Sequence, residues 1–337
     1  MQVETAFAAA LGVLEPPPAF AVAVSGGPDS TALMRLAAPM KPLVLTVDHG
    51  LRAGAAAEAE AVAGWAAALG LRHRILTWTG AKPARGIQEA ARAARYRLLA
   101  AACLEAGLTA LMTGHTLDDQ IETVAMRRGR GSGDWGAAGI PAQAELPDAP
   151  VRLMRPLIGL RKAMLTAWLD GGGHPYFRDP SNSDPRFARA RLRAGGAEAS
   201  LADMAALQRA RAAAERAAVA ALSGAEVTDG AVLVAQPALA GLDPAALDAA
   251  LAALLRVAGG QDHPGTRAER DRLAAAVREG GFPGRTLAGV MIRPARRREG
   301  PPGTIAFLPE GGGKVKRRHF WLPFGQFSQI FADGAAV

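Results

Sequence analysis

The sequence predicts an α/β protein in which a doubly wound parallel sheet is followed by a smaller, mainly helical C-terminal domain. Three observations support this prediction. Short apolar runs alternate with helical patterns through the first half of the 337-residue chain. A glycine-rich turn follows the first of these runs, at the edge where parallel sheets bind ligands. Beyond about residue 198 the chain becomes rich in Ala, and its apolar residues recur at helical spacing.

The elements of the first half follow one another in regular order. Apolar runs suited to buried parallel strands lie at residues 20–25, 43–47, 74–78 and 110–113. Helical patterns occupy residues 29–38, 55–69, 87–106 and 116–128. Strand–helix–strand repetition requires right-handed crossovers, which place the carboxyl ends of the strands along one edge of the sheet.

The rest of the chain is less regular. It predicts a glycine-rich loop at residues 129–139, a strand near 153–157, a helix over 161–169, and a turn leading into an arginine-studded helix over 176–193. Residues 200–258 read as helical, and a shorter mixed region with Gly and Pro interruptions closes the chain. We therefore predict two domains, a catalytic one at residues 1–198 and an accessory one at 199–337.

The chain is basic, with 39 Lys and Arg against 31 Asp and Glu and a formal net charge of +8. Such a charge is typical of proteins that bind a polyanion, although arginine-rich codon usage produces it as well. The excess is concentrated, because residues 151–216 carry twelve Lys or Arg and six Asp or Glu. This asymmetry favours a nucleic-acid partner.

The single cysteine, Cys103, excludes a disulfide framework within the chain and fits a reducing compartment. Its helical, apolar surroundings predict a small buried hydrophobic residue. No apolar run approaches the roughly 20 residues of a membrane span. The beginning of the chain carries Glu4 and lacks the basic region of a signal peptide, so we expect a cytoplasmic protein with no membrane partner.

The most informative stretch is Ser-Gly-Gly-Pro-Asp-Ser at residues 25–30, between a strand and a helix. Gly26 and Gly27 allow positive φ and close approach of an anion, and Pro28 suits the first turn of a helix. A helix N-terminus adds partial positive charge, and the hydroxyls of Ser25 and Ser30 are donors to phosphate oxygens. The lysine of the common Gly-x-x-x-x-Gly-Lys loop is absent. The alternative is a plain turn in which Asp29 caps the helix.

The end of the second strand and the third helical pattern add charged residues. Asp48, His49 and Arg52 follow the second strand, where Arg52 can face phosphate and Asp48 can order the loop. The alternative for Asp48 is a turn cap before Gly50. Arg92 and Arg95 occupy the next helix, where their spacing is typical of the exposed face of an amphipathic helix.

The fourth strand leads into an acidic helix start. Thr116 is a plausible N-cap with Asp119 as its capping partner. Asp118, Asp119 and Glu122 share a helix face, which favours a cation among them, either Mg²⁺ or an ammonium group. His115 precedes them and is a candidate for proton transfer near neutral pH, or a surface histidine.

Several strings occur together and in order, namely SGGPDS, VDHGLR, ARAARYRLL, TGHTLDDQIET, RPLIGLRK and RDPSNSDPRFARARLR. Together they resemble the tRNA(Ile)-lysidine synthetase family of N-type ATP pyrophosphatases, also called the PP-loop superfamily. The resemblance is strong over residues 18–195 and weak afterwards. It implies an adenine nucleotide α-hydrolase-like fold, ATP and Mg²⁺ as cofactors, and L-lysine and tRNA(Ile) with a CAU anticodon as substrates.

The activity implied by the resemblance is a two-step ligation. ATP adenylates O2 of the wobble cytidine and releases pyrophosphate, and lysine then replaces AMP to form lysidine, which changes codon recognition from AUG to AUA. Both monomer and homodimer are compatible with it.

The resemblance also assigns roles to residues. Adenylation and transfer would involve Asp29, Asp48, His49, His115, Asp119 and Glu122, the last two also as Mg²⁺ ligands. ATP would contact Ser25, Gly26, Gly27, Pro28, Asp29, Ser30, Arg52 and Arg95. Lysine and tRNA would contact Asp118, Gln120, Arg127, Arg128, Arg130, Asn182, Arg186, Arg189 and Arg193.

Three other functions share parts of this pattern. A tRNA thiolase of the same superfamily needs a persulfide cysteine or a cysteine-bound cluster, which a lone Cys103 argues against. A small-molecule adenylating amide synthetase does not explain the arginine excess or the second domain. A catalytically inactive RNA-binding protein would not be expected to keep Ser25, Asp29 and Ser30 together.

Overall fold

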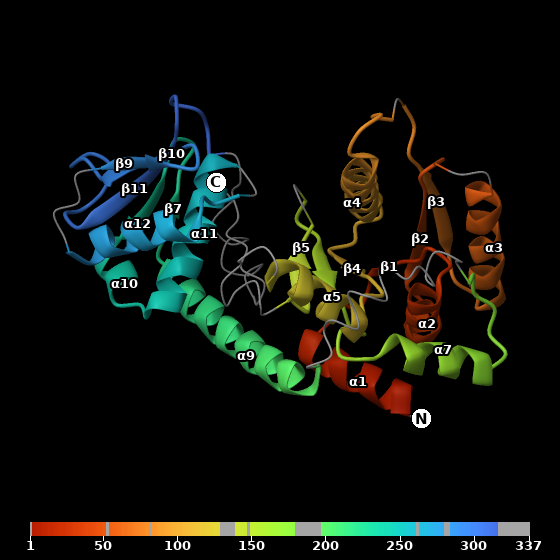
Figure 1. Ribbon diagram of the computed structural model, residues 1–337. Helices are drawn as coiled ribbons and strands as arrows, with labels where there is room; N and C mark the ends of the chain where they lie inside the picture. The colour runs from red at the N-terminus through yellow and green to blue at the C-terminus, as the bar shows by residue number, and fades with distance from the viewer. Residues whose placement is uncertain are drawn as a thin grey trace. The chain divides into compact units, whose positions relative to one another are not determined.

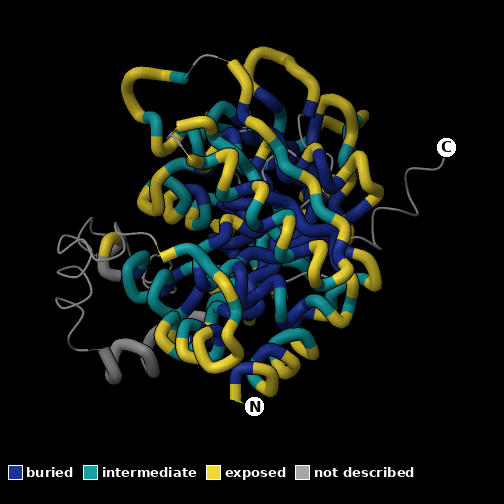
Figure 2. Tube along the Cα trace, turned by 90° about the vertical axis from the view of Figure 1, so that its right-hand side faces the viewer, coloured by how far each residue is buried: buried dark blue, intermediate teal, exposed yellow. Residues whose placement is uncertain are grey.

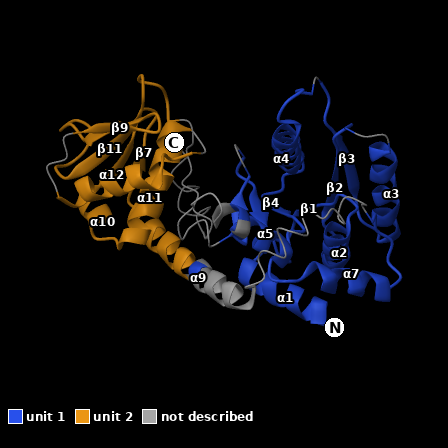
Figure 3. Ribbon diagram, in the orientation of Figure 1, with its two compact units in different colours: residues 1–207 blue, residues 208–337 orange. Residues whose placement is uncertain are grey.

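The computed structural model describes residues 2–51, 54–80, 82–128, 139–146, 149–178, 197–260, 263–279 and 284–315, with backbone alone at 125, 127, 128, 197–206, 208 and 209. The chain divides into two compact units, residues 1–207 and 208–337 (Figure 3). This division and the boundary predicted near residue 198 both fall within helix α9 (Ala197–Leu222). The predicted arginine-studded helix lies outside the described residues from residue 179 onward.

The first unit is built on a six-stranded sheet in the order β3-β2-β1-β4-β6-β5 (Figure 1). Its strands are β1 (Ala21–Ala23), β2 (Leu43–Asp48), β3 (His73–Thr77), β4 (Ala110–Met112), β5 (Gln143–Glu145) and β6 (Arg152–Met154). All neighbours are parallel except β5, which runs antiparallel to β6. The strand order reverses beside β1, so the topological switch point lies between β1 and β4. The predicted parallel sheet is confirmed, whereas β5 was not predicted.

Alternate residues of the strands face opposite sides of this sheet, as the two-residue period of a strand requires. Val22 and Val44 belong to a core that also contains buried residues of α1 (Gln2–Leu14), α2 (Pro28–Ala37), α3 (Ala55–Ala68) and α7 (Lys162–Gly171). Ala21, Leu43 and Leu45 face the other side and pack with α4 (Ile87–Glu105). The central strands β1, β2 and β4 are therefore buried on both faces, and the interior of the unit appears as dark blue in Figure 2.

Cys103 belongs to the second of these cores, on α4. Its side chain is fully buried and forms no disulfide. Burial raises the pKa of the thiol to about 12, so the thiolate is disfavoured at neutral pH. The prediction of a small buried hydrophobic residue is confirmed.

The second unit combines helices with an antiparallel sheet in the order β7-β8-β11-β10-β9. Its elements are the end of α9, β7 (Glu226–Val227), β8 (Val232–Ala235), α10 (Gln236–Ala240), α11 (Pro244–Gly259), α12 (Arg267–Glu279), β9 (Arg285–Leu287), β10 (Val290–Pro294) and β11 (Thr304–Pro309). Four helices agree with the mainly helical prediction, but the five-stranded sheet does not. Residues 200–258 were read as helical throughout, and they contain the β7–β8 hairpin. Its turn is closed by Thr228, whose hydroxyl accepts the Ala231 N–H at 3.0 Å.

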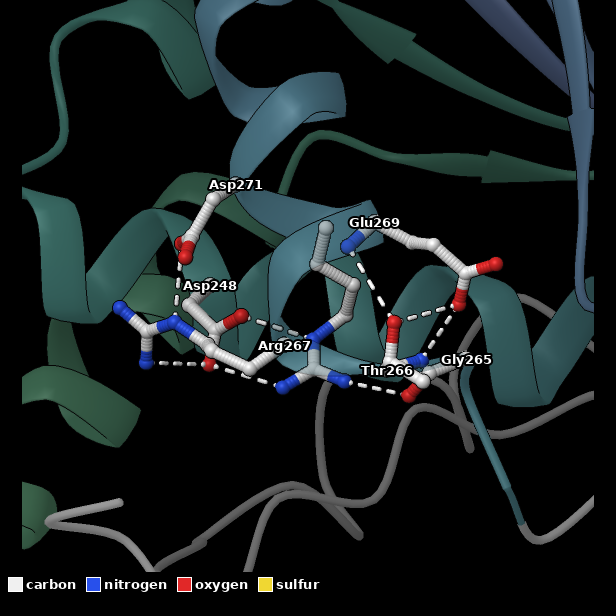
Figure 4. Close-up of polar contacts among 7 residues, drawn as sticks. Asp248, Gly265, Thr266, Arg267, Glu269 and Asp271 are labelled. Carbon is white, nitrogen blue, oxygen red and sulfur yellow. Dashed lines mark hydrogen bonds and ion pairs between the residues drawn. The ribbon is translucent and has the colours of Figure 1, made fainter. Parts of the chain in front are cut away.

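A buried carboxylate joins α11 to α12 in this unit (Figure 4). Asp248 accepts hydrogen bonds from Arg270 Nε at 2.7 Å and from Arg267 at 3.1 Å. Only 6% of the Asp248 side chain and 13% of the Arg270 side chain are exposed. Helix α12 begins with a capping box, in which Thr266 donates its N–H and hydroxyl to Glu269. Among the described residues, no helix has the length and apolar character that crossing a membrane requires.

Candidate active site

The site is built around the turn at residues 25–30, here called the phosphate loop, which joins β1 to α2. Gly26 has φ of +86°, in the left-handed region that favours glycine. Gly27 is extended and caps α2, and Pro28 occupies the first helical turn. The Ser30 hydroxyl accepts the Ser25 N–H at 3.1 Å and donates to Gly27 O at 3.1 Å. The loop is thus held by its own side chain at the positive end of a helix, where N–H groups lack intrahelical partners.

The phosphate loop opens into a pocket of about 710 Å³ at the carboxyl ends of β1, β2 and β4. This volume is within the range of small-molecule and cofactor sites. The predicted residues that line it are Ser25, Gly27, Pro28, Asp29, Ser30, Asp48, His49, Arg95, His115 and Asp119. Residues from segments far apart in the sequence therefore meet in one cavity, as the switch-point rule predicts.

The loops that follow β1 and β4 touch backbone to backbone at Gly114. A Cβ atom at this position would lie 2.9 Å from backbone atoms of Asp29 and Ser30. Only glycine allows this approach, so Gly114 fixes how closely His115 and Asp119 come to the phosphate loop. Sequence reasoning did not single out Gly114, although its place in Thr-Gly-His at a strand end was the available signal.

Asp29 forms an ion pair that the sequence analysis missed. Its Oδ2 lies 3.1 Å from Nζ of Lys162, the first residue of α7, and Lys162 also lines the pocket. The other oxygen, Oδ1, is buried and has no hydrogen-bond partner. Burial raises the pKa of Asp29, Lys162 opposes this, and the negative charges of Asp119 and Asp118 add to it. The only earlier signal for Lys162 was the string RPLIGLRK.

Asp118 and Asp119 point to different partners. Asp118 accepts the backbone N–H of Lys162 at 2.8 Å and lies 3.4 Å from Arg161, so it caps α7. Asp119 accepts the N–H of Thr116 at 2.7 Å and its hydroxyl at 3.1 Å, at the start of α5 (Leu117–Arg128). The capping alternative for Asp119 is confirmed. Asp118 also holds a second helix, a role that the prediction of three acids on one helix face did not include.

The structure places Gln120 differently from the predicted contact with lysine or tRNA. Its side chain is buried, with 1% exposure, and it hydrogen-bonds both the N–H and the C=O of Ile140. It does not line the pocket. Gly139 has φ of +69°, and a Cβ there would collide with Gln120. Gln120 therefore fixes the chain as it enters β5, and the predicted contact with substrate is not supported.

His115 is held by Thr113, with 2.9 Å between Nδ1 and the hydroxyl. Burial, together with the positive charges of Arg155, Arg92 and Arg95, lowers the pKa of His115 to about 3. The imidazole is therefore neutral at physiological pH. The lowered pKa favours a neutral hydrogen-bonding role for His115, and proton transfer by His115 stays a prediction.

The residues after β2 are ordered locally while facing the pocket. Asp48 accepts the Gly50 N–H at 2.8 Å, which is the turn-capping alternative. His49 has a buried Nδ1 without a hydrogen-bond partner and makes an edge contact with Trp78 at 6.1 Å between centroids. Burial, and then Arg95, lower the pKa of His49. Both Arg92 and Arg95 lie over the Tyr96 ring, and only Arg95 lines the pocket.

The remaining predicted residues are not placed in the pocket. Gly26 and Glu122 are described but do not line it. Arg52, Arg130, Asn182, Arg186, Arg189 and Arg193, and the side chains of Arg127 and Arg128, lie outside the described residues.

The donors present fit a phosphate group accompanied by a cation. No group of three or more His, Cys, Asp or Glu suited to a metal forms within the described part of the chain. The unpartnered Asp29 Oδ1 beside Asp119 and Asp118 nevertheless suits Mg²⁺, which commonly takes only one or two carboxylates and fills its shell with phosphate oxygens and water.

Comparisons with known proteins agree with this geometry. The model of the PP-loop domain family matches residues 2–195. A tRNA(Ile)-lysidine synthase of Methylobacterium nodulans is 47% identical over 294 residues, which cover 80% of this chain and 86% of that protein. The chain belongs to the tRNA(Ile)-lysidine synthase family.

Other relatives extend the comparison. The tRNA(Ile)-lysidine synthase of Methylobacterium sp. (strain 4-46) is 55% identical over 176 residues, which span 51% of either chain. Among solved structures, the U34-tRNA thiolase NcsA from Methanococcus maripaludis has a TM-score of 0.51 at 15% identity, covering 62% of this chain and 77% of that one. At that identity the likeness shows a common fold. The expected adenine nucleotide α-hydrolase-like fold of this family is confirmed.

Proposed function

We propose that this member of the tRNA(Ile)-lysidine synthase family is an ATP-dependent carbon–nitrogen ligase that converts the wobble cytidine of a CAU anticodon to lysidine. The observation that carries the proposal is the pocket, in which the phosphate loop meets Asp29, Lys162 and Asp119. The chain's similarity to a tRNA(Ile)-lysidine synthase over 80% of its length points to the same reaction.

The first step is adenylation of the base. Cytidine O2 attacks the α-phosphorus of ATP, and the bond to the bridging oxygen of pyrophosphate breaks. The phosphate loop, with its hydroxyls and the N-terminus of α2, holds the pyrophosphate as charge develops on it. The ammonium group of Lys162 adds positive charge in the same pocket. Mg²⁺, when bound, would neutralise phosphate charge, and Asp29, Asp119 and Glu122 are the carboxylates that would hold it.

The second step replaces AMP by lysine. The amine attacks C2, the bond between C2 and the adenylated oxygen breaks, and AMP leaves while the amine gives up a proton. Asp48 and Asp119 line the pocket and suit a lysine ammonium group. His49 and His115 have lowered pKa values, so they add no positive charge that would repel it.

Contacts with tRNA are proposed for the basic segments. Residues 151–216 carry twice as many basic as acidic residues, and three arginines at 186, 189 and 193 share the spacing of one helix face. Arg127, Arg128, Arg130 and Asn182 complete this proposed surface, and the second unit is proposed as an accessory tRNA-binding domain. The cytoplasm is the compartment where such a tRNA is modified, and a homodimer is left open.

The thiolase alternative is disfavoured by the surroundings of the single cysteine. Cys103 is buried on α4, does not line the pocket, and has a raised pKa. Sulfur delivery needs a reactive thiolate or a cluster ligand, and neither fits this position.

An Asp29→Ala variant tests the adenylation site. We expect it to release at least about a hundredfold less pyrophosphate from ATP in the presence of tRNA, since electrostatic groups of this kind contribute 10²–10³ to rates. Glu105→Ala is the matched control, because Glu105 forms an exposed pair with Arg74 away from the pocket. Circular dichroism and the melting temperature check that both variants fold. Near-normal release by Asp29→Ala would remove Asp29 from the reaction.

A further inference from the structure

The segment before residue 179 makes an unexpected contact with the phosphate loop. The Phe177 N–H donates to the Gly26 carbonyl at 2.8 Å, and the Phe177 side chain lines the pocket. We propose that Phe177 is a positioning residue that holds the phosphate loop in its ATP-binding conformation. The inference rests on the ATP-binding part of the proposed function and assigns a role to a residue that the resemblance leaves without one.

The hydrogen bond orients a peptide that faces the ligand. In a planar trans peptide the C=O and the following N–H point in opposite directions. Because the Gly26 carbonyl is directed at Phe177, the Gly27 N–H is directed away from it, and Gly27 lines the pocket. The contact therefore selects one of the two orientations that this peptide can adopt, namely the one that leaves an N–H for phosphate.

The Phe177 ring occupies the space where any side chain at residue 26 would lie. A Cβ on Gly26 would fall 2.5 and 2.7 Å from ring atoms Cδ2 and Cε2 of Phe177, and 3.1 Å from Val62. Residue 26 must therefore be glycine for two reasons, because its φ is +86° and because the Phe177 ring leaves no room for a Cβ atom. The ring packs at 4.9 Å between centroids against Trp65 of α3, so it is held between the loop and a helix.

The segment that carries Phe177 is itself tied to α7. The His174 N–H donates to Leu169 O at 2.9 Å, and both the Tyr176 hydroxyl and Arg178 contact Asp170. Contacts on both sides of Phe177 along the chain fix the position of its N–H. A preorganised loop binds its ligand more tightly because less ordering remains to be done on binding.

Phe177→Ala and Phe177→Leu test the role, with Phe7→Leu as the control. Phe7 lies on α1 and is part of the core against which Phe177 packs, but it does not line the pocket. We expect Phe177→Ala to raise the calorimetric Kd for ATP with Mg²⁺ by about tenfold, and Phe177→Leu by less. Phe7→Leu should lower the melting temperature while leaving that Kd within about twofold of the parent protein. Unchanged ATP affinity in Phe177→Ala, or an equal loss in Phe7→Leu, would overturn the proposal.

A double variant separates positioning from simple packing. Gly26→Ala should weaken ATP binding because its methyl group meets the Phe177 ring. In the Phe177→Ala background that collision is relieved and only the strain of the positive φ at residue 26 remains, so the combined loss should be smaller than the product of the two single losses. Multiplicative losses would show that the two residues act independently and would contradict the contact.

Binding of ATP by the parent protein without lysine transfer would refute the proposed function alone, whereas the Kd values still decide the role of Phe177.

Discussion

Asp29 is a half-buried acid with a raised pKa, and Lys162 is the counter-charge that opposes this rise. Replacing Lys162 by Met removes this counter-charge, so the pKa of Asp29 should rise further. If the ionised carboxylate is the active form, the acid limb of the pH profile of kcat/KM for ATP should move to higher pH. Profiles from pH 5 to 9 measure this. Lys162→Arg keeps the charge and serves as the control, and an acid limb that stays in place in Lys162→Met would argue against the coupling.

His115 makes a prediction about stability. Its folded-state pKa of about 3 lies below the ordinary histidine value of 6.5, so the unfolded chain binds the extra proton between these values. Stability should therefore fall as the pH drops below about 6.5, by about 1.4 kcal/mol per pH unit from this group. A His115→Gln variant should lose this component, and its free energy of unfolding should decline less than that of the parent protein between pH 7 and pH 5. Parallel declines in urea titrations would show that His115 ionises normally.

At the residue scale, local roles were predictable and distant partners were not. Capping by Asp48 and Asp119 followed from neighbours within three residues. Lys162 and Phe177 reach the phosphate loop only through tertiary packing, which has no periodic signature in the sequence. Gln120 was misassigned for the same reason, since Ile140 lies on another segment.

At the element scale, the helix pair α11–α12 depends on one buried acid. Asp248→Ala would leave Arg270, which is largely buried, without its carboxylate partner. We expect a loss of about 3–5 kcal/mol in the free energy of unfolding of this unit. Arg267 pairs with Asp248 and also with the exposed Asp271. Asp271→Ala removes only the exposed partner and should cost about 0–1 kcal/mol in the free energy of unfolding. Urea unfolding of both variants measures the difference, and equal losses would mean that Asp248 contributes no more than a surface ion pair.

The elements themselves show where pattern reasoning succeeds. The parallel strands were predictable because burial on both faces produces continuous apolar runs such as residues 43–47. The β7–β8 hairpin was missed because Ala-rich flanks extend a helical pattern across it, although Val232, Leu233 and Val234 favour a strand. Strand β5 has three residues and pairs only with β6, so it leaves almost no periodic signal.

At the scale of the whole molecule, the chain has two units with separate sheets, and the pocket belongs entirely to the first. Within the basic segment that favours RNA, residues 151–178 carry five Lys or Arg against one Asp, and the arginine run within residues 179–196 lies outside the described part of the chain. Fold and nucleotide pocket therefore have direct structural support, whereas the RNA surface depends on charge and family resemblance.

One measurement tests the central claim most directly. The protein is incubated with labelled lysine, ATP, Mg²⁺ and bacterial tRNA, and acid-stable label in the tRNA is counted with and without ATP. Lysine transfer predicts label that requires ATP and that falls to background when a tRNA(Ile) transcript with a changed wobble cytidine is the only acceptor. Cleavage of ATP to AMP and pyrophosphate without any label in tRNA would contradict the account, because the pocket would then activate a different acceptor.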